Sequence, residues 1–278
     1  MFYSDGILKR SDLLRRDGVM HGFSTRLGGV SEHPYTREMN LAFGREDPDE
    51  TVLRNAEIFA RAVSGGGYGA DSAVCASQIH SVKVRYVTEV DRGDGYLIRP
   101  PAGEPGDGFY TDRPGVLLTV RIADCVPILL TGEREDGSPV IAAVHAGWRG
   151  TVGGIAGEAV RLLVEAGVML NTVRAAVGPH IGECCFTVRE DFRDAVTAAR
   201  GPDFASRHIK ETDGALHADL TGMDLEILRE AGVPREHIDV SPDCTACLNG
   251  IYHSHRRTAG RRGAMGAGIV ITGKDRDK

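Results

Sequence analysis

The chain has 278 residues, of which 41% are hydrophobic and 26% charged, a composition typical of a globular protein with a sizeable core. Its formal net charge of −6 argues against a general nucleic-acid-binding protein, which would carry a basic face. The N-terminus is charged and lacks the apolar segment of a signal peptide, and no stretch is long and apolar enough to cross a bilayer, so we expect a cytoplasmic protein without a membrane anchor.

Hydrophobic periodicity and turn residues predict the following elements in chain order. A helix over Pro48–Val63 is followed by strands over Val82–Val90, Val116–Val120, Pro127–Leu130 and Val140–Val144, a helix over Thr151–Ala166, a strand over Val173–Val177, helices over Glu190–Arg200 and Leu220–Ala231, and strands over Ile238–Val240 and Gly268–Ile271. Strands outnumber helices and do not alternate strictly with them. We therefore expect an α+β fold with helices packed outside mixed sheets, and a doubly wound sheet is the alternative.

Reactive side chains stand beside three of the apolar runs. His80 precedes the strand at Val82, Cys125 lies between two strands, and His145 ends the run Val140–Val144. Ligand-binding groups gather at strand ends, and imidazole and thiolate ligands suit zinc, with copper as the less favoured metal. Three protein ligands leave a fourth position open, as in a catalytic site. The alternative is one buried cysteine with two hydrogen-bonded histidines.

The segment after His145 adds a candidate anion site. Gly147 and Gly150 flank Trp148 and Arg149 at the expected start of a helix, where free backbone N–H groups favour an anion. Arg149 can pair with such an anion through its planar guanidinium. The alternative is a tight turn from strand to helix, with Trp148 as a core residue.

Six segments, in this order, resemble one known family. They are HGFSTRLGGVS (21–31), QIHS (78–81), ADCVP (123–127), AAVHAGWRGT (142–151), VGPHIGECCF (177–186) and CTAC…YHSHRR…GR (244–247, 252–257 and 260–261). Together they resemble the laccase-domain family, also called the YfiH-like or multicopper polyphenol oxidase family, from about residue 18 to residue 271. The resemblance implies a compact, single-domain sandwich of two sheets between helices, so we expect one domain over residues 1–278.

The resemblance also implies a function and a ligand set. His80, Cys125 and His145 match the family's metal ligands, usually for zinc. The implied activities are phosphorolysis of adenosine, inosine, guanosine and methylthioadenosine, together with adenosine deamination, so purine nucleoside and phosphate are the expected partners. Departures from the family pattern at Ile122, His180 and His255 make the substrate preference less secure than the class.

Phosphorolysis assigns expected roles to further residues. Arg26, in a glycine-rich loop, and Arg149 are the first candidates for binding phosphate. Gln78 is expected to contact substrate or support the metal ligands. Asp124 either acts on the base, orients a ligand histidine, or is structural. We therefore expect Asp124, Cys125 and Arg149 to be catalytic, and Arg26, Gln78 and Arg149 to bind substrate.

Two further motifs carry weaker signals. Cys244–Cys247 forms a CxxC motif and Cys184–Cys185 can supply the other half of a second metal site, but separate reduced thiols are the favoured interpretation. The arginines near the C-terminus either steer anions toward the pocket or form a solvated loop, and the second interpretation is favoured for Arg262.

Three other functions compete with the phosphorylase. A copper polyphenol oxidase (laccase) would need a denser histidine array than the chain offers near Cys125. A hydrolase acting on cell-wall precursors would use Cys125 as a nucleophile activated by a histidine. A metal-stabilised binding module would have no activity. The sequence gives no indication of the oligomeric state.

Overall fold

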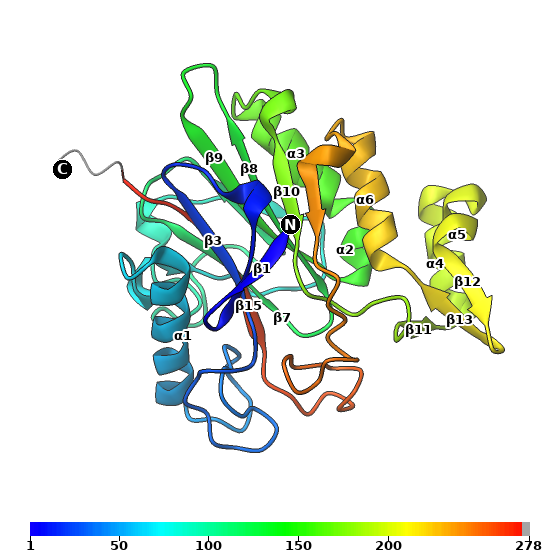
Figure 1. Ribbon diagram of the computed structural model, residues 1–278, viewed down its shortest axis with the longest axis horizontal. Coiled ribbons are helices and arrows are strands. Elements are labelled where there is room, and N and C mark those ends of the chain that lie inside the picture. The colour runs from blue at the N-terminus through cyan, green and yellow to red at the C-terminus, as the bar shows by residue number, and fades with distance from the viewer. Residues whose placement is uncertain (274–278) are drawn as a thin grey trace.

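The computed structural model describes residues 1–273. Its first sheet has six strands in the order β1-β2-β3-β15-β7-β4. These strands are β1 (Phe2–Asp5), β2 (Leu8–Ser11), β3 (Val19–Ser24), β4 (Ala73–Val74), β7 (Leu117–Ile122) and β15 (Met265–Ile271). All of its pairs are antiparallel except β4 with β7. The last strand in the chain, β15, therefore lies in the middle of this sheet (Figure 1).

The second sheet also has six strands, in the order β14-β10-β8-β9-β6-β5. They are β5 (Val84–Tyr86), β6 (Gly108–Thr111), β8 (Val126–Glu133), β9 (Pro139–Ala146), β10 (Arg174–Val177) and β14 (Ile238–Val240). Its centre is the long antiparallel pair of β8 and β9, while β10 and β14 run parallel to each other. Parallel neighbours leave the sheet at the same edge, so the loops after β10 and β14 emerge together.

The two sheets pack face to face around one layer of apolar side chains. Along β8, Leu129 packs in this inter-sheet core, whereas Ile128 and Leu130 pack on the opposite face of the sheet. Phe23 and Ile269 of the first sheet complete the inter-sheet layer. This alternation follows from the two-residue period of a strand. Both faces of these strands are buried, so they read in the sequence as continuous apolar runs.

Helices cover the outer face of each sheet. Helix α1 (Asp49–Ser64) packs on the first sheet, burying Val52, Phe59 and Val63 on one side. Helices α2 (Trp148–Gly153), α3 (Ile155–Glu165) and α6 (Leu220–Glu230) pack on the second sheet (Figure 1). The α+β sandwich expected from the sequence is therefore confirmed.

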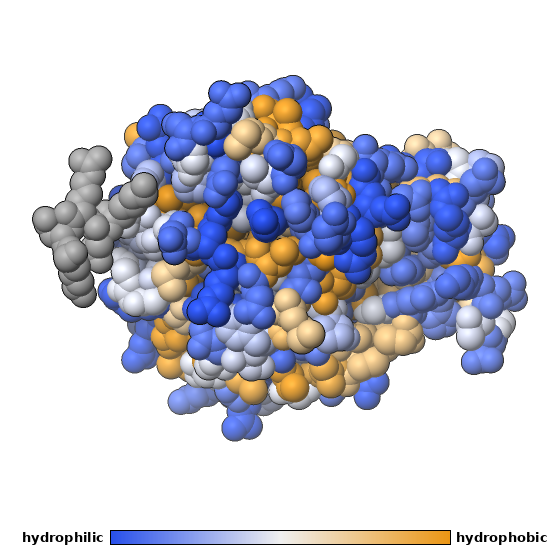
Figure 2. Space-filling model, turned by 45° about the horizontal axis from the view of Figure 1, so that its top comes forward, coloured by the Kyte–Doolittle hydropathy of each residue, from blue (hydrophilic) through white to orange (hydrophobic). Residues whose placement is uncertain are grey.

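A small lobe extends from this sandwich. It contains a third sheet in the order β11-β13-β12, with helices α4 (Glu190–Arg200) and α5 (Pro202–His208). The strands are β11 (Thr187–Val188), β12 (Ile209–Thr212) and β13 (Ala215–Ala218). Hydrophilic residues cover most of this lobe, at the right of Figure 2, while apolar side chains show between polar ones over the middle of the same face. Across residues 1–273, no helix is long and apolar enough to cross a membrane.

Several predicted elements differ from those in the structure. The helix expected over 151–166 begins earlier, at Trp148, and breaks at Gly154, whose φ of +86° is a left-handed conformation that suits glycine. The strand expected over 82–90 is confined to Val84–Tyr86. The edge hairpin of β1 and β2 was not predicted, because most of its residues are polar, including Arg10 and Ser11, which are buried. Helix α5 and the third sheet were missed for the same reason.

Candidate metal centre

Cys125 lies where the chain crosses from one sheet to the other. Strand β7 of the first sheet ends at Ile122, and β8 of the second begins at Val126. The intervening turn includes Asp124, whose φ is +87°, a conformation rarely adopted by residues with a side chain. The turn thus places the thiol of Cys125 at one end of the sandwich.

His80 and His145 reach the same place from different elements. His145 is near the end of β9, opposite Pro127 of β8. His80 is in the loop between β4 and β5 with a φ of +60°, and its ring meets that of His145 edge-on, with 5.0 Å between the ring centroids. Gly147 makes room for this arrangement, because a Cβ atom at that position would lie 2.3 Å from Cδ2 of His80.

The three side chains converge as a metal-ligand set. One ligand atom from each of His80, Cys125 and His145 lies within 4.8 Å of the other two, and the distance from Cys125 Sγ to His80 Nε2 is 3.9 Å. His145 is buried, Cys125 is half-buried and His80 is exposed. Two imidazoles and one thiolate fit a tetrahedral transition-metal site and would leave its fourth position open.

Asp107 supports both histidines and was missed by the sequence analysis. Its Oδ1 accepts hydrogen bonds from His145 Nδ1 at 2.9 Å and from the backbone N–H of His80 at 3.0 Å. Its Oδ2 accepts from the backbone N–H and hydroxyl of Ser81, at 2.6 and 2.8 Å. A carboxylate on Nδ1 leaves Nε2 of His145 free as the ligand and fixes the orientation of the ring.

The electrostatics favour a thiolate at Cys125 paired with a protonated ring at His145, which must release its proton to bind a metal. Burial raises the pKa of the Cys125 thiol, but His145 and then His80 outweigh it, and the pKa falls to about 6. Burial lowers the pKa of His145, while the Cys125 thiolate and Asp107 raise it to about 9. Cys125 is therefore mainly a thiolate at neutral pH, the form in which cysteine binds metal.

The larger of two cavities beside the ligand set is basic. It has a volume of about 520 Å³, within the usual range for small-molecule sites. Among the described residues no aspartate or glutamate lines it, whereas four arginines do: Arg45, Arg99, Arg121 and Arg262. The Nε atom of Arg262 is buried without a hydrogen-bond partner. Such a cavity suits an anionic ligand.

A second cavity adjoins the first at the ligand set and has a volume of about 340 Å³. It shares His80, Ala123, Cys125 and Arg262 with the first. Its other lining residues include the aromatic side chains of Trp148 and Phe186. His80 and Cys125 therefore border both a basic and an aromatic cavity, while His145 borders the basic one.

The structure gives Gln78 and Asp124 definite partners. The side-chain amide of Gln78 pairs with both the N–H and the C=O of Arg121, at 2.8 Å each, while lining the basic cavity. Asp124 lines the aromatic cavity, and its carboxylate accepts from the hydroxyl of Thr245 at 2.7 Å and from the backbone N–H of Arg256 at 2.6 Å. Both side chains thus hold the walls of the site together.

Arg26 and Arg149 are not in either cavity. Arg26 donates to the carbonyl of Asn249 and lines a separate, smaller cavity of about 70 Å³ beside Tyr35. Arg149 is exposed, with its guanidinium 4.2 Å from the centre of the Trp148 ring. Instead, Arg262, expected in a solvated loop, is half-buried beside Cys125. The adjacent RR and GR motifs were the only signal for it in the sequence.

The three departures from the family pattern have different surroundings. Ile122 lines the basic cavity and His255 lines the aromatic one, so both contribute to the pocket walls. His180 is buried, with Nδ1 hydrogen-bonded to the carbonyl of Gly178 and Nε2 to the hydroxyl of Thr221. His180 therefore packs beneath the site and lines neither cavity.

With this geometry in view, comparisons with known proteins are informative. A family model described as multi-copper polyphenol oxidoreductase laccase matches residues 20–272. The chain belongs to this family. One relative in the family, the purine nucleoside phosphorylase YlmD of Geobacillus stearothermophilus, is 34% identical over 89% of this chain and 88% of its own length. The adenosine deaminase RL5, from an unknown prokaryotic organism, is 33% identical over 94% of this chain and 98% of its own.

A solved structure shows the same fold. The crystal structure of YlmD from Geobacillus stearothermophilus aligns with a TM-score of 0.86 and 33% identity, covering 98% of this chain and 99% of that one. The similarity thus extends over both sheets and the small lobe, beyond the segments that carry the motifs.

Proposed function

We propose that this protein is a zinc-dependent purine nucleoside phosphorylase acting on adenosine, inosine, guanosine and methylthioadenosine. The observation that carries the proposal is the position of His80, Cys125 and His145 where a basic and an aromatic cavity meet. A phosphorylase must bind phosphate and the purine base on opposite sides of the anomeric carbon. Relatives named purine nucleoside phosphorylase support the same reaction.

The basic cavity is the proposed phosphate site. Arginine binds phosphate through a planar fork of donors, and the unpartnered Nε of Arg262 offers a free donor close to Cys125. Arg121 lines the same cavity and is anchored by a hydrogen bond from Nη2 to the carbonyl of Ala76 at 3.1 Å. Arg262 and Arg121 replace Arg26 and Arg149 as the proposed phosphate ligands, because the latter two lie outside the cavity.

The aromatic cavity is the proposed site of the purine. Trp148 and Phe186 offer apolar faces to a planar base, and stacking of a base on an aromatic side chain is favourable by about 1–3 kcal/mol. His255 borders the same cavity. With the base there and phosphate beside Arg262, the ribose would lie next to the metal ligands.

The reaction replaces one bond to the anomeric carbon with another. A phosphate oxygen forms a bond to C1′ of the ribose, the bond from C1′ to the purine nitrogen breaks, and the purine takes up a proton. The arginines hold phosphate, as the monoanion or dianion, against C1′, and the proton that it loses on forming the new bond balances the one that the purine gains. Binding the two substrates side by side converts their encounter into a reaction between neighbours. A zinc ion held by His80, Cys125 and His145 would supply an electrophile with one open position. Asp107 keeps the ring of His145 in place.

Adenosine deamination is a second candidate activity of the same site. The specific observation is the relative named adenosine deaminase RL5, with which this chain shares 33% identity over nearly its whole length. Deamination consumes water and releases ammonia, so it requires no phosphate. Substitution of the proposed phosphate arginines should therefore impair phosphorolysis more than deamination.

Zinc is proposed rather than copper because of the ligands available. Within residues 1–273, the only metal-competent cluster with histidines contains two of them and one cysteine, whereas a multicopper centre needs many more. The six cysteines are all free, which suits the reducing cytoplasm that we propose as the location.

The test is phosphate-dependent release of hypoxanthine from inosine, followed by chromatography on protein of known metal content. We expect release only with phosphate, and loss of activity and of one bound metal ion in His80→Ala. His33→Ala is the matched control, because His33 is a half-buried histidine outside both cavities. No release of hypoxanthine from the zinc-loaded wild type would overturn the proposal and favour a hydrolase with Cys125 as the nucleophile. Phosphate-dependent release that survives in His80→Ala without metal would overturn the zinc dependence.

A further inference from the structure

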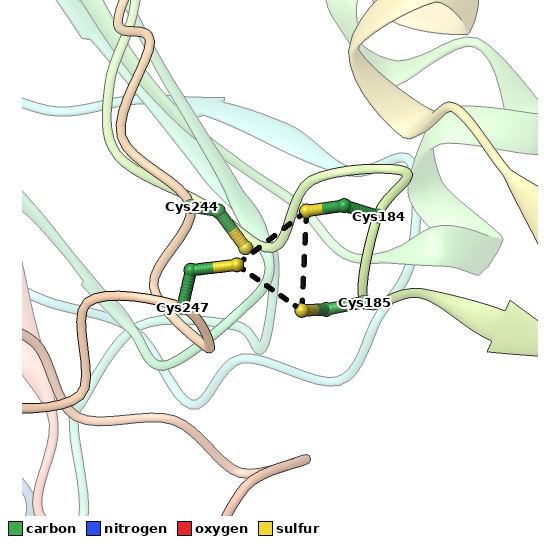
Figure 3. Close-up of side chains that lie close together, drawn as sticks. All are labelled: Cys184, Cys185, Cys244 and Cys247. Carbon is green, nitrogen blue, oxygen red and sulfur yellow. Dashed lines mark hydrogen bonds between the residues drawn. The ribbon is translucent and has the colours of Figure 1, made fainter.

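Four of the six cysteines meet at a second place, away from the candidate metal centre. Cys184 and Cys185 are in the loop after β10, and Cys244 and Cys247 are in the loop after β14. Because β10 and β14 are parallel neighbours, both loops leave the sheet at the same edge, and a further parallel bridge joins His180 to Cys244. Figure 3 shows all four sulfur atoms directed toward one point between the two loops.

We propose that these four cysteines bind a second zinc ion, which is structural. A tetrahedral zinc ion with zinc–sulfur bonds of about 2.3 Å requires sulfur–sulfur distances of about 3.8 Å. The sulfur of Cys247 is 3.6 Å from that of Cys184 and 3.4 Å from that of Cys185, and the last two are 3.9 Å apart. All four sulfur atoms lie within 4.8 Å of one another, so the set has the size of a zinc tetrahedron before any ion is placed.

A disulfide fits the same cluster less well. Bonded sulfur atoms are about 2.05 Å apart, well below the shortest distance here of 3.4 Å. Two disulfides would be needed to engage all four cysteines, whereas all four are free thiols in the structure. In addition, the backbone N–H of Gly182 donates to the sulfur of Cys244 at 3.2 Å, the kind of hydrogen bond that supports metal-bound thiolates. Cys184 and Cys247 are exposed, which leaves a path for the ion.

A zinc ion at this place would hold the wall of the aromatic cavity. The loop that contains Cys244 and Cys247 also contains Thr245, whose hydroxyl donates to Asp124, the neighbour of Cys125. Arg256 donates to the carbonyl of Cys185 at 3.1 Å, and its own backbone N–H reaches Asp124. By fixing the two loops to each other, the ion would stabilise the turn on which Cys125 stands.

The first experiment measures zinc per chain in protein purified from cells under reducing conditions. We expect about two zinc ions per wild-type chain and about one in either Cys247→Ser or His80→Ala, with none in the double variant. Cys75→Ala is the matched control, because Cys75 is buried and belongs to neither cluster. Cys247→Ser should also melt at a lower temperature than Cys75→Ala relative to wild type.

Two further measurements do not depend on a variant that folds. X-ray absorption at the zinc edge of the wild type should give about 2.5 sulfur ligands per zinc on average, from four at one site and one at the other. Intact-mass measurement should show six reduced thiols after the metal is removed. One zinc per wild-type chain, or a mass lower by two hydrogens that marks a disulfide, would overturn the proposal. Neither result depends on nucleoside phosphorolysis, so this inference and the proposed function fail separately.

Discussion

Replacement of Asp107 by asparagine tests whether the candidate metal centre depends on the group that orients its histidines. The carboxylate is fully buried, and each of its oxygens accepts at least two hydrogen bonds, one oxygen from His145 and His80 and the other from Ser81. The side-chain amide of asparagine has one acceptor, its oxygen, and one donor group, its NH₂. One side of the group must therefore place N–H against N–H, whichever way the amide is turned.

The expected effect is a loss of zinc affinity with the fold retained. Removal of a carboxylate that orients a histidine ligand typically lowers metal affinity about 10-fold to 100-fold, which corresponds to about 1.4 to 2.7 kcal/mol. We expect the lower end of this range if the amide oxygen stays on His145 and the higher end if it turns toward Ser81. The activity of fully zinc-loaded Asp107→Asn should fall less than its activity at limiting zinc.

The assay is competition for zinc with a chromogenic chelator, carried out in a Cys247→Ser background so that only one site is measured. Asp112→Asn is the matched control. It follows the same short strand, β6, at the opposite end from Asp107, and its carboxylate contacts Tyr86 and Arg134 instead of the metal ligands. Zinc affinity in Asp107→Asn equal to that in Asp112→Asn would refute the argument.

Three other predictions follow from the site and the core. Gly147→Ala should reduce zinc content, because its new Cβ would overlap the ring of His80, and metal analysis after dialysis checks this. Arg262→Ala should raise the KM for phosphate at least about tenfold with zinc content unchanged. Substitution of the exposed Arg37 by alanine is the control and should leave this KM unchanged. Equal KM values for phosphate in the two variants would contradict the proposed phosphate site. Burial raises the pKa of Asp224 well above its ordinary value, so the folded state retains a proton that the unfolded chain releases, and stability falls as pH rises above the unfolded pKa. The free energy of unfolding in urea should therefore fall less for Asp224→Asn than for the wild type between about pH 5 and about pH 8. An equal fall in both proteins would show that this carboxyl does not titrate as described.

Local sequence was sufficient for strands β8, β9 and β10 and for the choice of candidate ligands, whereas the buried strands β3 and β6 were not predicted. Strands β8, β9 and β10 are buried on both faces, and such strands appear in the sequence as apolar runs that can be recognised without a partner. His80, Cys125 and His145 stand beside these runs, and their side-chain chemistry is the same in any fold. The edge hairpin and the small lobe lack such runs, so their strands were not predicted.

The neighbours of the site depended on contacts that only the folded chain makes. Asp107 and Asp112 flank the same strand and look alike in the sequence, but only the packing of β6 beside β9 brings Asp107 under His145. Arg262 was expected in solvent, whereas the turn after β7 and the loop before β15 bury it beside Cys125.

The sequence by itself determined which atoms can bind a metal, because a thiolate or an imidazole is a property of one residue. The tertiary structure alone decided which of them lie together. The parallel pairing of β10 with β14 joins Cys184 and Cys185 to Cys244 and Cys247 across about 60 residues of chain, and no local pattern encodes such a pairing.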